Sequence, residues 1–165
     1  MSNPPVKHVL FVCTGNSARS ILAEGLLNRL GAGRFVAHSA GSHPTGLVNP
    51  HALVALRALG MSGCGFRSKN WDEFAQAGAP ACDYVFTVCD NAAGEMCPVW
   101  PGTPATAHWG VPDPAAVVGT DSEKARAFMA TALALQRRIE LLLALPLEGL
   151  DAAAIRRELQ RIGNA

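Results

Sequence analysis

Cys13 and Arg19 are separated by five residues, a spacing that could bind and attack an oxyanion. The residues between them are small or polar, and their backbone N–H groups could turn inward: Thr14, Gly15, Asn16, Ser17 and Ala18. Gly15 adopts positive φ freely, and Asn16 does so more readily than most residues, so this loop can curl tightly. A nest of N–H groups at a helix N-terminus holds a tetrahedral oxyanion, and an arginine can clamp two of its oxygens.

Cys13 is the candidate nucleophile. Because it lies beneath the expected anion and near a helix N-terminus, we expect a lowered pKa and a thiolate at neutral pH. Ser20 is placed to donate a hydrogen bond to that thiolate. The alternative is that Cys13 is a packed cysteine at a strand end and Arg19 a surface residue, since buried cysteines are often only part of a core.

The flanking sequence favours the catalytic interpretation. An apolar, β-branched run over residues 9–12 predicts a buried strand, and apolar residues recur at helical spacing from Ile21 to Leu30. The helix should end near Gly31. A strand, a tight loop and a helix N-terminus in this order are the context that an anion-binding loop requires.

A proton donor and two further thiols complete the chemistry. Asp113 stands between Pro112 and Pro114 and could protonate a leaving oxygen, although an aspartate before proline also often caps a turn. Cys89 ends an expected strand over 83–88, and Cys97 follows in the next loop. Such loops line the ligand site of an α/β sheet, so the two thiols resemble a resolving pair for disulfide exchange. The alternative is a packed Cys89 and an incidental Cys97.

The remaining pattern alternates strands and helices, which predicts a mainly parallel α/β sheet with the ligand at the carboxyl end of the first strand. Further strands are expected over 35–39 and 107–109. Helices are expected over 50–60 with Asn49 as N-cap, over 67–77, from a cap at Asp121 or Ser122 to Pro146, and over 151–162 with Asp151 as N-cap.

Composition limits the class of protein. The 165 residues predict one domain, with 49% hydrophobic and 16% charged residues, as in a globular chain. A net charge of +1 gives no reason to expect nucleic acid, and no apolar run approaches membrane length. Five scattered cysteines do not fit a secreted disulfide scaffold, so we expect a cytoplasmic protein. The five histidines show no zinc-ligand spacing with the cysteines, and no metal is expected.

The stretch VLFVCTGNSARS resembles the P-loop of the low-molecular-weight tyrosine phosphatase fold family, and within it that of the thiol-dependent arsenate reductases. The resemblance covers about residues 6–145. It implies a three-layer fold with a mainly parallel four-stranded sheet flanked by helices. The helix over 151–162 is an addition, either packed on the fold or used as a dimer contact.

The resemblance also assigns roles. Asp113 matches the general acid of an Asp-Pro motif, but Ala115 follows where the phosphatases usually have a tyrosine, and Tyr84 is the only tyrosine in the chain. Reductases of the family carry two cysteines in the loop that here holds Cys89 and Cys97, some with one residue fewer between them. Ala18 stands where relatives often have a further cysteine.

The implied activity is arsenate reduction. Cys13 attacks arsenate, Asp113 protonates the departing oxygen, Cys89 attacks Cys13 to release arsenite, and Cys97 takes over the disulfide. A thioredoxin-like or glutaredoxin-like protein regenerates the thiols, no cofactor is bound, and phosphate or sulfate could occupy the same loop. The alternatives are a phosphotyrosine phosphatase and a non-enzymatic oxyanion-binding or redox-sensing protein.

Support of the P-loop is also implied. Glu24 and Ser39, with Asn16, match positions that bind a potassium ion in some related reductases, and the acidic ligand of that ion aligns with Lys69. The Lys69 ammonium could therefore take the place of the ion, or Lys69 is a solvated surface residue. Cys64 and Cys82 match no functional position.

Overall fold

A parallel sheet of four strands forms the centre of the structure, a computed structural model that describes residues 5–89, 100 and 104–165. The strands are listed by their bounds: β1 (Lys7–Cys13), β2 (Phe35–Gly41), β3 (Tyr84–Thr87) and β4 (Ala105–His108). Their order is β2-β1-β3-β4, and every pairing is parallel. The expected sheet is confirmed, and the apolar run of β1 lies in an interior strand, as parallel sheets require.

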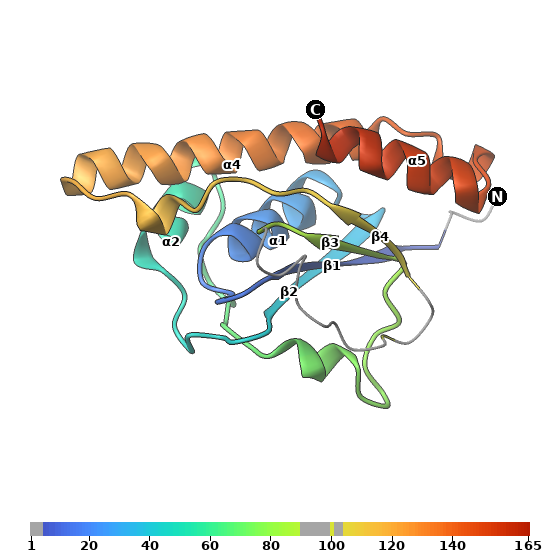
Figure 1. The fold of residues 1–165 in the computed structure, drawn as a ribbon, viewed down its shortest axis with the longest axis horizontal. Helices are drawn as coiled ribbons and strands as arrows, with labels where there is room; N and C mark the ends of the chain where they lie inside the picture. Colours follow the sequence, from blue (N-terminus) through green and yellow to red (C-terminus); the bar gives the residue numbers. More distant parts are fainter. Residues whose placement is uncertain (1–4, 90–99, 101–103) are drawn as a thin grey trace.

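Among the described residues, four α-helices accompany the sheet: α1 (Arg19–Leu30), α2 (Pro50–Ala58), α4 (Asp121–Leu143) and α5 (Ala152–Gly163). Three short 3₁₀ turns complete the described elements: η1 (Trp71–Phe74), η2 (Pro114–Ala116) and η3 (Leu147–Gly149). In Figure 1 the helices α1, α4 and α5 lie on one side of the sheet and η1 lies on the other. This is the expected layered α/β architecture.

Capping residues set the helix starts, and two expectations need correction. Asn49 accepts a hydrogen bond from the His51 N–H, and Asp151 accepts one from Ala154, as expected for N-caps. The cap of α4 is Thr120 rather than Asp121 or Ser122, because its hydroxyl and the Glu123 side chain form a capping box. The helix expected over 67–77 is only the single turn η1.

The C-terminal helix packs on the sheet edge. Trp109 follows β4, and its indole is fully buried and stacks on the Phe86 ring, with 3.8 Å between the ring centroids. The indole N–H donates a hydrogen bond to the Leu159 carbonyl on α5 (2.9 Å). A Cβ on Gly163 would collide with the His108 carbonyl, so α5 and β4 meet backbone to backbone. Of the two roles expected for this helix, the packed helix is the observed one.

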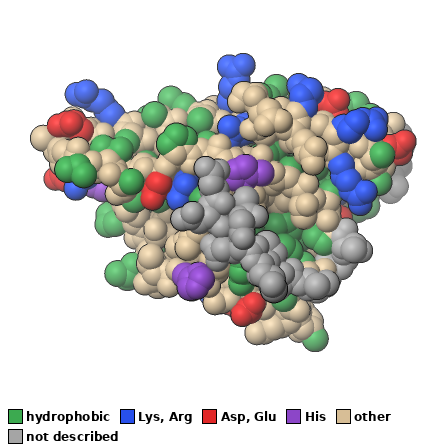
Figure 2. Space-filling model, viewed as in Figure 1, with side chains coloured by type: hydrophobic (Ala, Val, Ile, Leu, Met, Phe, Trp, Pro, Cys, Tyr) green, Lys and Arg blue, Asp and Glu red, His purple; other side chains and the backbone are tan. Residues whose placement is uncertain are grey.

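The outer surface carries charges of both signs. Figure 2 shows basic and acidic side chains intermixed over α4 and α5, in line with the small net charge of +1. Within the described residues, no helix combines the length and apolarity needed to cross a membrane.

Candidate active site

The loop after β1 turns its backbone N–H groups toward its own interior. Four of its carbonyls accept hydrogen bonds from backbone N–H groups in the segment 42–49, at 2.9–3.3 Å: those of Cys13, Thr14, Gly15 and Ser17. A trans peptide places the N–H of the next residue opposite the carbonyl, and no cis peptide occurs among the described residues. With these carbonyls bound to the segment 42–49, the following N–H groups point away from that segment, which is the arrangement that the predicted nest requires.

Asn16 provides the sharp turn of this loop. Its φ is +46°, and its N–H donates to the Cys13 sulfur at 3.2 Å. Gly15, which we also expected to use positive φ, does not, because the single left-handed residue at Asn16 closes the loop. Gly41 lets β2 approach, since a Cβ there would collide with the Thr14 carbonyl.

The N-terminus of α1 is open toward this loop. Its N-cap, Ala18, provides no side-chain hydrogen bond, and its first turn holds no acidic residue. No capping side chain therefore binds the first N–H groups of the helix, the Ser20 N–H donates to the Cys13 sulfur, and the positive end of the helix dipole lies at the loop. Both properties favour an anion at this place.

Cys13 ends β1 beneath the nest and is 4% exposed. Its sulfur lies 2.8 Å from the Ser20 hydroxyl. Burial raises the pKa of the Cys13 thiol, and the nearby Cys89 raises it further, while hydrogen bonds from Ser20 and Asn16 lower it. The expectation of a lowered pKa is therefore wrong, because desolvation of the thiolate outweighs these hydrogen bonds.

Arg19 and Asp113 meet at the mouth of the loop. Arg19 Nη1 donates to the Val111 carbonyl (3.1 Å), and Nη2 lies 3.7 Å from Asp113 Oδ2. Asp113 Oδ1 accepts the Ala115 N–H at 3.0 Å and so caps η2. Asp113 thus caps a turn with one oxygen and faces Arg19 with the other, while its role as a proton donor stays a prediction.

Cys89 lies beside the loop that holds Cys13. The Val88 N–H donates to the Val12 carbonyl (2.9 Å), which aligns the ends of β3 and β1. The Cys89 sulfur is 3.6 Å from the Thr14 hydroxyl, and the residue is 2% exposed. Cys97, the second thiol of the predicted pair, lies outside the described residues.

No disulfide links the four cysteines that the structure describes, which are Cys13, Cys64, Cys82 and Cys89. Cys64 is exposed. Cys82 is buried, and burial raises the pKa of its thiol to about 11. In the same described ranges, no three His, Cys, Asp or Glu side chains group as metal ligands.

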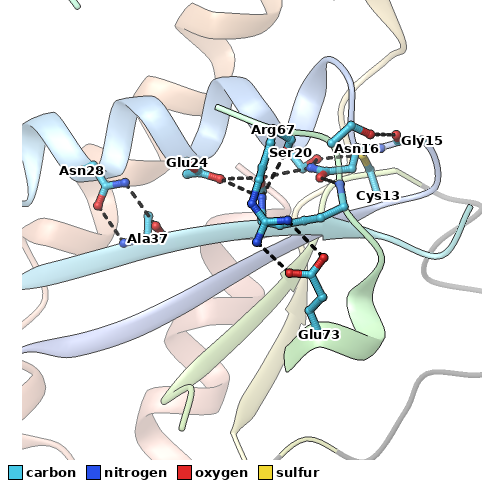
Figure 3. Close-up of polar contacts among 12 residues, drawn as sticks. Cys13, Gly15, Asn16, Ser20, Glu24, Asn28, Ala37, Arg67 and Glu73 are labelled. Carbon is cyan, nitrogen blue, oxygen red and sulfur yellow. Dashed lines mark hydrogen bonds and ion pairs between the residues drawn. The ribbon is translucent and has the colours of Figure 1, made fainter. Parts of the chain in front are cut away.

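The side chain of Asn16 links the loop to β2 and α1 (Figure 3). Its amide nitrogen donates to the hydroxyls of Ser20 (2.8 Å) and Ser39 (3.0 Å), and its oxygen accepts the Lys69 N–H (2.9 Å). Ser20 therefore has its own proton left for Cys13. Ser39 in turn donates to Glu24.

Lys69 and Glu24 close this network as an ion pair. Lys69 Nζ lies 3.7 Å from Glu24 Oε1 and donates to the Arg67 carbonyl at 3.1 Å. Both side chains are largely buried, at 8% and 14% exposure. Burial raises the pKa of Glu24, which Ser39 and Lys69 counteract, and burial lowers the pKa of Lys69, which Glu24 counteracts. Lys69 is thus not a solvated surface lysine.

Two residues that hydrogen-bond to backbone carbonyls around the site, Ser68 and Arg138, were not identified from the sequence. The Ser68 hydroxyl donates to the Gly15 carbonyl (3.1 Å). Arg138 Nη1 donates to the carbonyls of Trp109 (2.8 Å) and Gly110 (2.9 Å), which precede Asp113. No sequence signal distinguishes Ser68 from other loop serines, or Arg138 from its neighbour Arg137 on the same helix.

Comparisons with known proteins give a consistent relationship. The sequence model of the low molecular weight phosphotyrosine protein phosphatase family matches residues 8–161, which takes in most of α5 and extends past the boundary near 145 that the resemblance suggested. An arsenate reductase of Halalkalibacterium halodurans is 37% identical over 118 residues, 72% of this chain and 81% of that protein.

Solved structures with the same fold give the same relationship. An arsenate reductase in the phosphate binding state aligns with a TM-score of 0.64 and 28% identity, over 84% of this chain and 98% of that one. A thioredoxin-dependent arsenate reductase of Corynebacterium glutamicum aligns with a TM-score of 0.55 and 25% identity, over 84% of this chain and 64% of that one.

Proposed function

We propose that this chain, which belongs to the low molecular weight phosphotyrosine protein phosphatase family, reduces arsenate to arsenite through a relay of thiols. The observation that carries the proposal is the placement of Cys89, a second buried thiol, against the loop that holds Cys13. Phosphate ester hydrolysis has no use for that thiol, whereas reduction of arsenic requires one. The arsenate reductases among its relatives support the same assignment.

In the first step arsenate occupies the nest, with its oxygens on the loop N–H groups and on Arg19. The thiol proton of Cys13 passes to a basic oxygen of arsenate, since burial leaves the free thiol protonated. The sulfur then forms a bond to arsenic, an arsenic–oxygen bond breaks, and Asp113 gives its proton to the departing oxygen, which leaves as water.

In the second step the Cys89 thiol gives its proton to an arsenic-bound oxygen, and its sulfur attacks the Cys13 sulfur. A sulfur–sulfur bond forms, the electron pair of the sulfur–arsenic bond moves to arsenic, and arsenic leaves as arsenite. Cys97 then attacks Cys89, which releases Cys13 and leaves a Cys89–Cys97 disulfide. A thioredoxin-like or glutaredoxin-like protein reduces that disulfide, and the name of the Corynebacterium glutamicum neighbour supports such a partner. The relay needs reduced thiols, which fits the cytoplasm.

A network of hydrogen bonds holds the loop between Cys13 and Arg19 in shape, and it ends at the buried ammonium of Lys69. We assign this support to Asn16, Ser39, Glu24 and Lys69, with the Lys69 ammonium in the place of a bound potassium ion. The contact of Lys69 with Glu24 and its backbone bond to Asn16 support the assignment.

Hydrolysis of phosphotyrosine is the second candidate, because the same loop could bind a phosphate ester. Tyr84 is buried in β3, stacked on Phe86, and Ala115 follows the Asp113-Pro114 step, so these positions offer no aromatic wall for a phenolic ring. We therefore expect slow hydrolysis of aryl phosphates rather than efficient turnover.

A coupled assay tests the proposal. Arsenate should drive NADPH consumption when thioredoxin with its reductase, or glutaredoxin with glutathione and its reductase, is supplied. The Cys89→Ser variant should retain slow aryl phosphate hydrolysis, because the P-loop is intact, but lose arsenate-dependent NADPH consumption. Equal reductase rates for the wild type and Cys89→Ser would reject the relay and favour the phosphatase.

A further inference from the structure

The three residues that lead from β4 toward Asp113 present their carbonyls to arginine side chains. Arg138, on α4, donates from Nη1 to the carbonyls of Trp109 (2.8 Å) and Gly110 (2.9 Å). Arg19, on α1, donates from Nη1 to the Val111 carbonyl (3.1 Å). Cations donating to carbonyls form stronger hydrogen bonds than neutral donors do.

The opposite edge of this segment is bound to the sheet. The Trp109 N–H donates to the Thr87 carbonyl (2.7 Å), and the Val111 N–H donates to that of Val88 (3.2 Å). The Trp109 indole is also fixed by the Leu159 carbonyl of α5. Residues 109–111 are therefore held from both sides, by the end of β3 on one and by two guanidinium groups on the other.

This anchoring determines where the Asp113 carboxylate can lie. Only Pro112 separates Asp113 from Val111, and the proline ring restricts the connecting φ. Beyond it, Asp113 Oδ1 is held by the Ala115 N–H, so Oδ2 is directed toward Arg19. A loss of the Arg138 contacts would release the start of this segment while leaving the P-loop contacts untouched.

We infer that Arg138 is a positioning residue for Asp113, acting through the carbonyls of Trp109 and Gly110. The inference rests on the proposed function, in which Asp113 protonates the departing oxygen. Arg138 is distant in sequence from every residue of the P-loop, and its hydrogen bonds go to the backbone of Trp109 and Gly110. Its effect is confined to the reaction step that needs the proton.

Comparing the hydrolysis rates of esters with different leaving groups distinguishes the step that needs the proton from the other steps. The nitrophenolate of 4-nitrophenyl phosphate departs with little need for a proton, whereas phenolate from phenyl phosphate, and the oxygen lost from arsenate, need one. Arg138→Met should slow phenyl phosphate hydrolysis and arsenate reduction about 10-fold or more, because small misplacements of a catalytic group are costly. It should slow 4-nitrophenyl phosphate hydrolysis only about 2- to 3-fold.

Control variants separate positioning from folding. Arg137→Met changes the exposed neighbour on the same helix and should leave both ester rates unchanged. Arg138→Lys should restore part of the phenyl phosphate rate, since an ammonium can still donate to one carbonyl. In an Asp113→Asn background, Arg138→Met should cause no further loss on phenyl phosphate.

Equal losses on both esters, or a full additional loss in the Asp113→Asn background, would overturn the inference. Amide hydrogen exchange provides a readout without turnover: Arg138→Met, but not Arg137→Met, should speed exchange at Trp109 and Val111. If the wild type turns over neither arsenate nor esters, the proposed function fails, and unchanged exchange in Arg138→Met would separately reject the positioning role.

Discussion

Ser20 and Asn16 are the residues that oppose the effect of burial on the Cys13 thiol. Ser20 receives a hydrogen bond from the Asn16 side chain, and its hydroxyl lies 2.8 Å from the Cys13 sulfur, which leaves its proton available for a thiolate there. Burial nevertheless raises the pKa of Cys13. The sequence located the nucleophile and its donors by type and spacing, but it could not weigh desolvation against hydrogen bonding, because burial depends on the whole fold.

At this scale we predict that Ser20→Ala raises the Cys13 pKa further, since it removes a donor that stabilises the thiolate. A higher pKa leaves less thiolate at neutral pH, so the midpoint of iodoacetate alkylation at Cys13 moves to higher pH. Cys89→Ala should move that midpoint to lower pH, because the charge of Cys89 raises the Cys13 pKa. Peptide mass mapping across a pH series measures both shifts.

The exposed Ser62→Ala serves as the control and should leave the midpoint in place. An unchanged midpoint in Ser20→Ala would show that this hydroxyl does not stabilise the thiolate.

At the scale of elements, strands and helices followed from apolar periodicity and capping residues. The run of β1, the Asn49-Pro50 start of α2 and the Asp151 cap of α5 were all readable from the sequence. The start of α4 was misplaced because three consecutive residues from Thr120 can each cap a helix, and only the reciprocal bond with Glu123 identifies the cap.

The Lys69–Glu24 ion pair connects the loop before η1 to α1 and should replace a bound cation. Activity and melting temperature of the wild type should not change when potassium is exchanged for tetramethylammonium at constant ionic strength. Lys69→Met should destabilise the protein by at least about 1 kcal/mol, because it leaves a buried carboxylate without its partner. Thermal denaturation and the coupled assay provide the measurements.

The matched control is Arg67→Met, which breaks the exposed ion pair between Arg67 and Glu73. It should cost less than about 1 kcal/mol, as surface ion pairs usually do. Saturable activation of the wild type by potassium would contradict the role given to Lys69.

At the scale of the whole molecule, we propose a single domain in which α5 is part of the common core. Leu159 and Ile162 of α5 are fully buried in the core that also contains β1 and α4. The amphipathic spacing of these residues predicted the helix, but not its docking partner. That contact depends on Trp109 and Gly163, which are far apart in the sequence and carry no pairing signal.

Gly163→Ala tests this packing. The new methyl group would meet the His108 carbonyl and force α5 away from β4, so we expect a loss of about 1–3 kcal/mol, typical of overpacking. Urea denaturation should show one cooperative transition for the wild type and one for Gly163→Ala, with the midpoint of the variant at a lower urea concentration.

Gly149→Ala is the control, since a Cβ at that position meets no atom within 4 Å. Equal midpoints for Gly163→Ala and the wild type, or two separate transitions in the wild type, would refute the single packed core.

The thiol relay itself is tested most directly by one turnover of the Cys97→Ser variant. This change leaves Cys13 and Cys89 in place but removes the thiol that would resolve their disulfide. Reduced Cys97→Ser protein, given excess arsenate and no reductant, should release one equivalent of arsenite. Peptide mass mapping should then find Cys13 joined to Cys89. Multiple turnovers at the wild-type rate with the reductant protein, or a single turnover that leaves Cys13 and Cys89 unlinked, would contradict the relay.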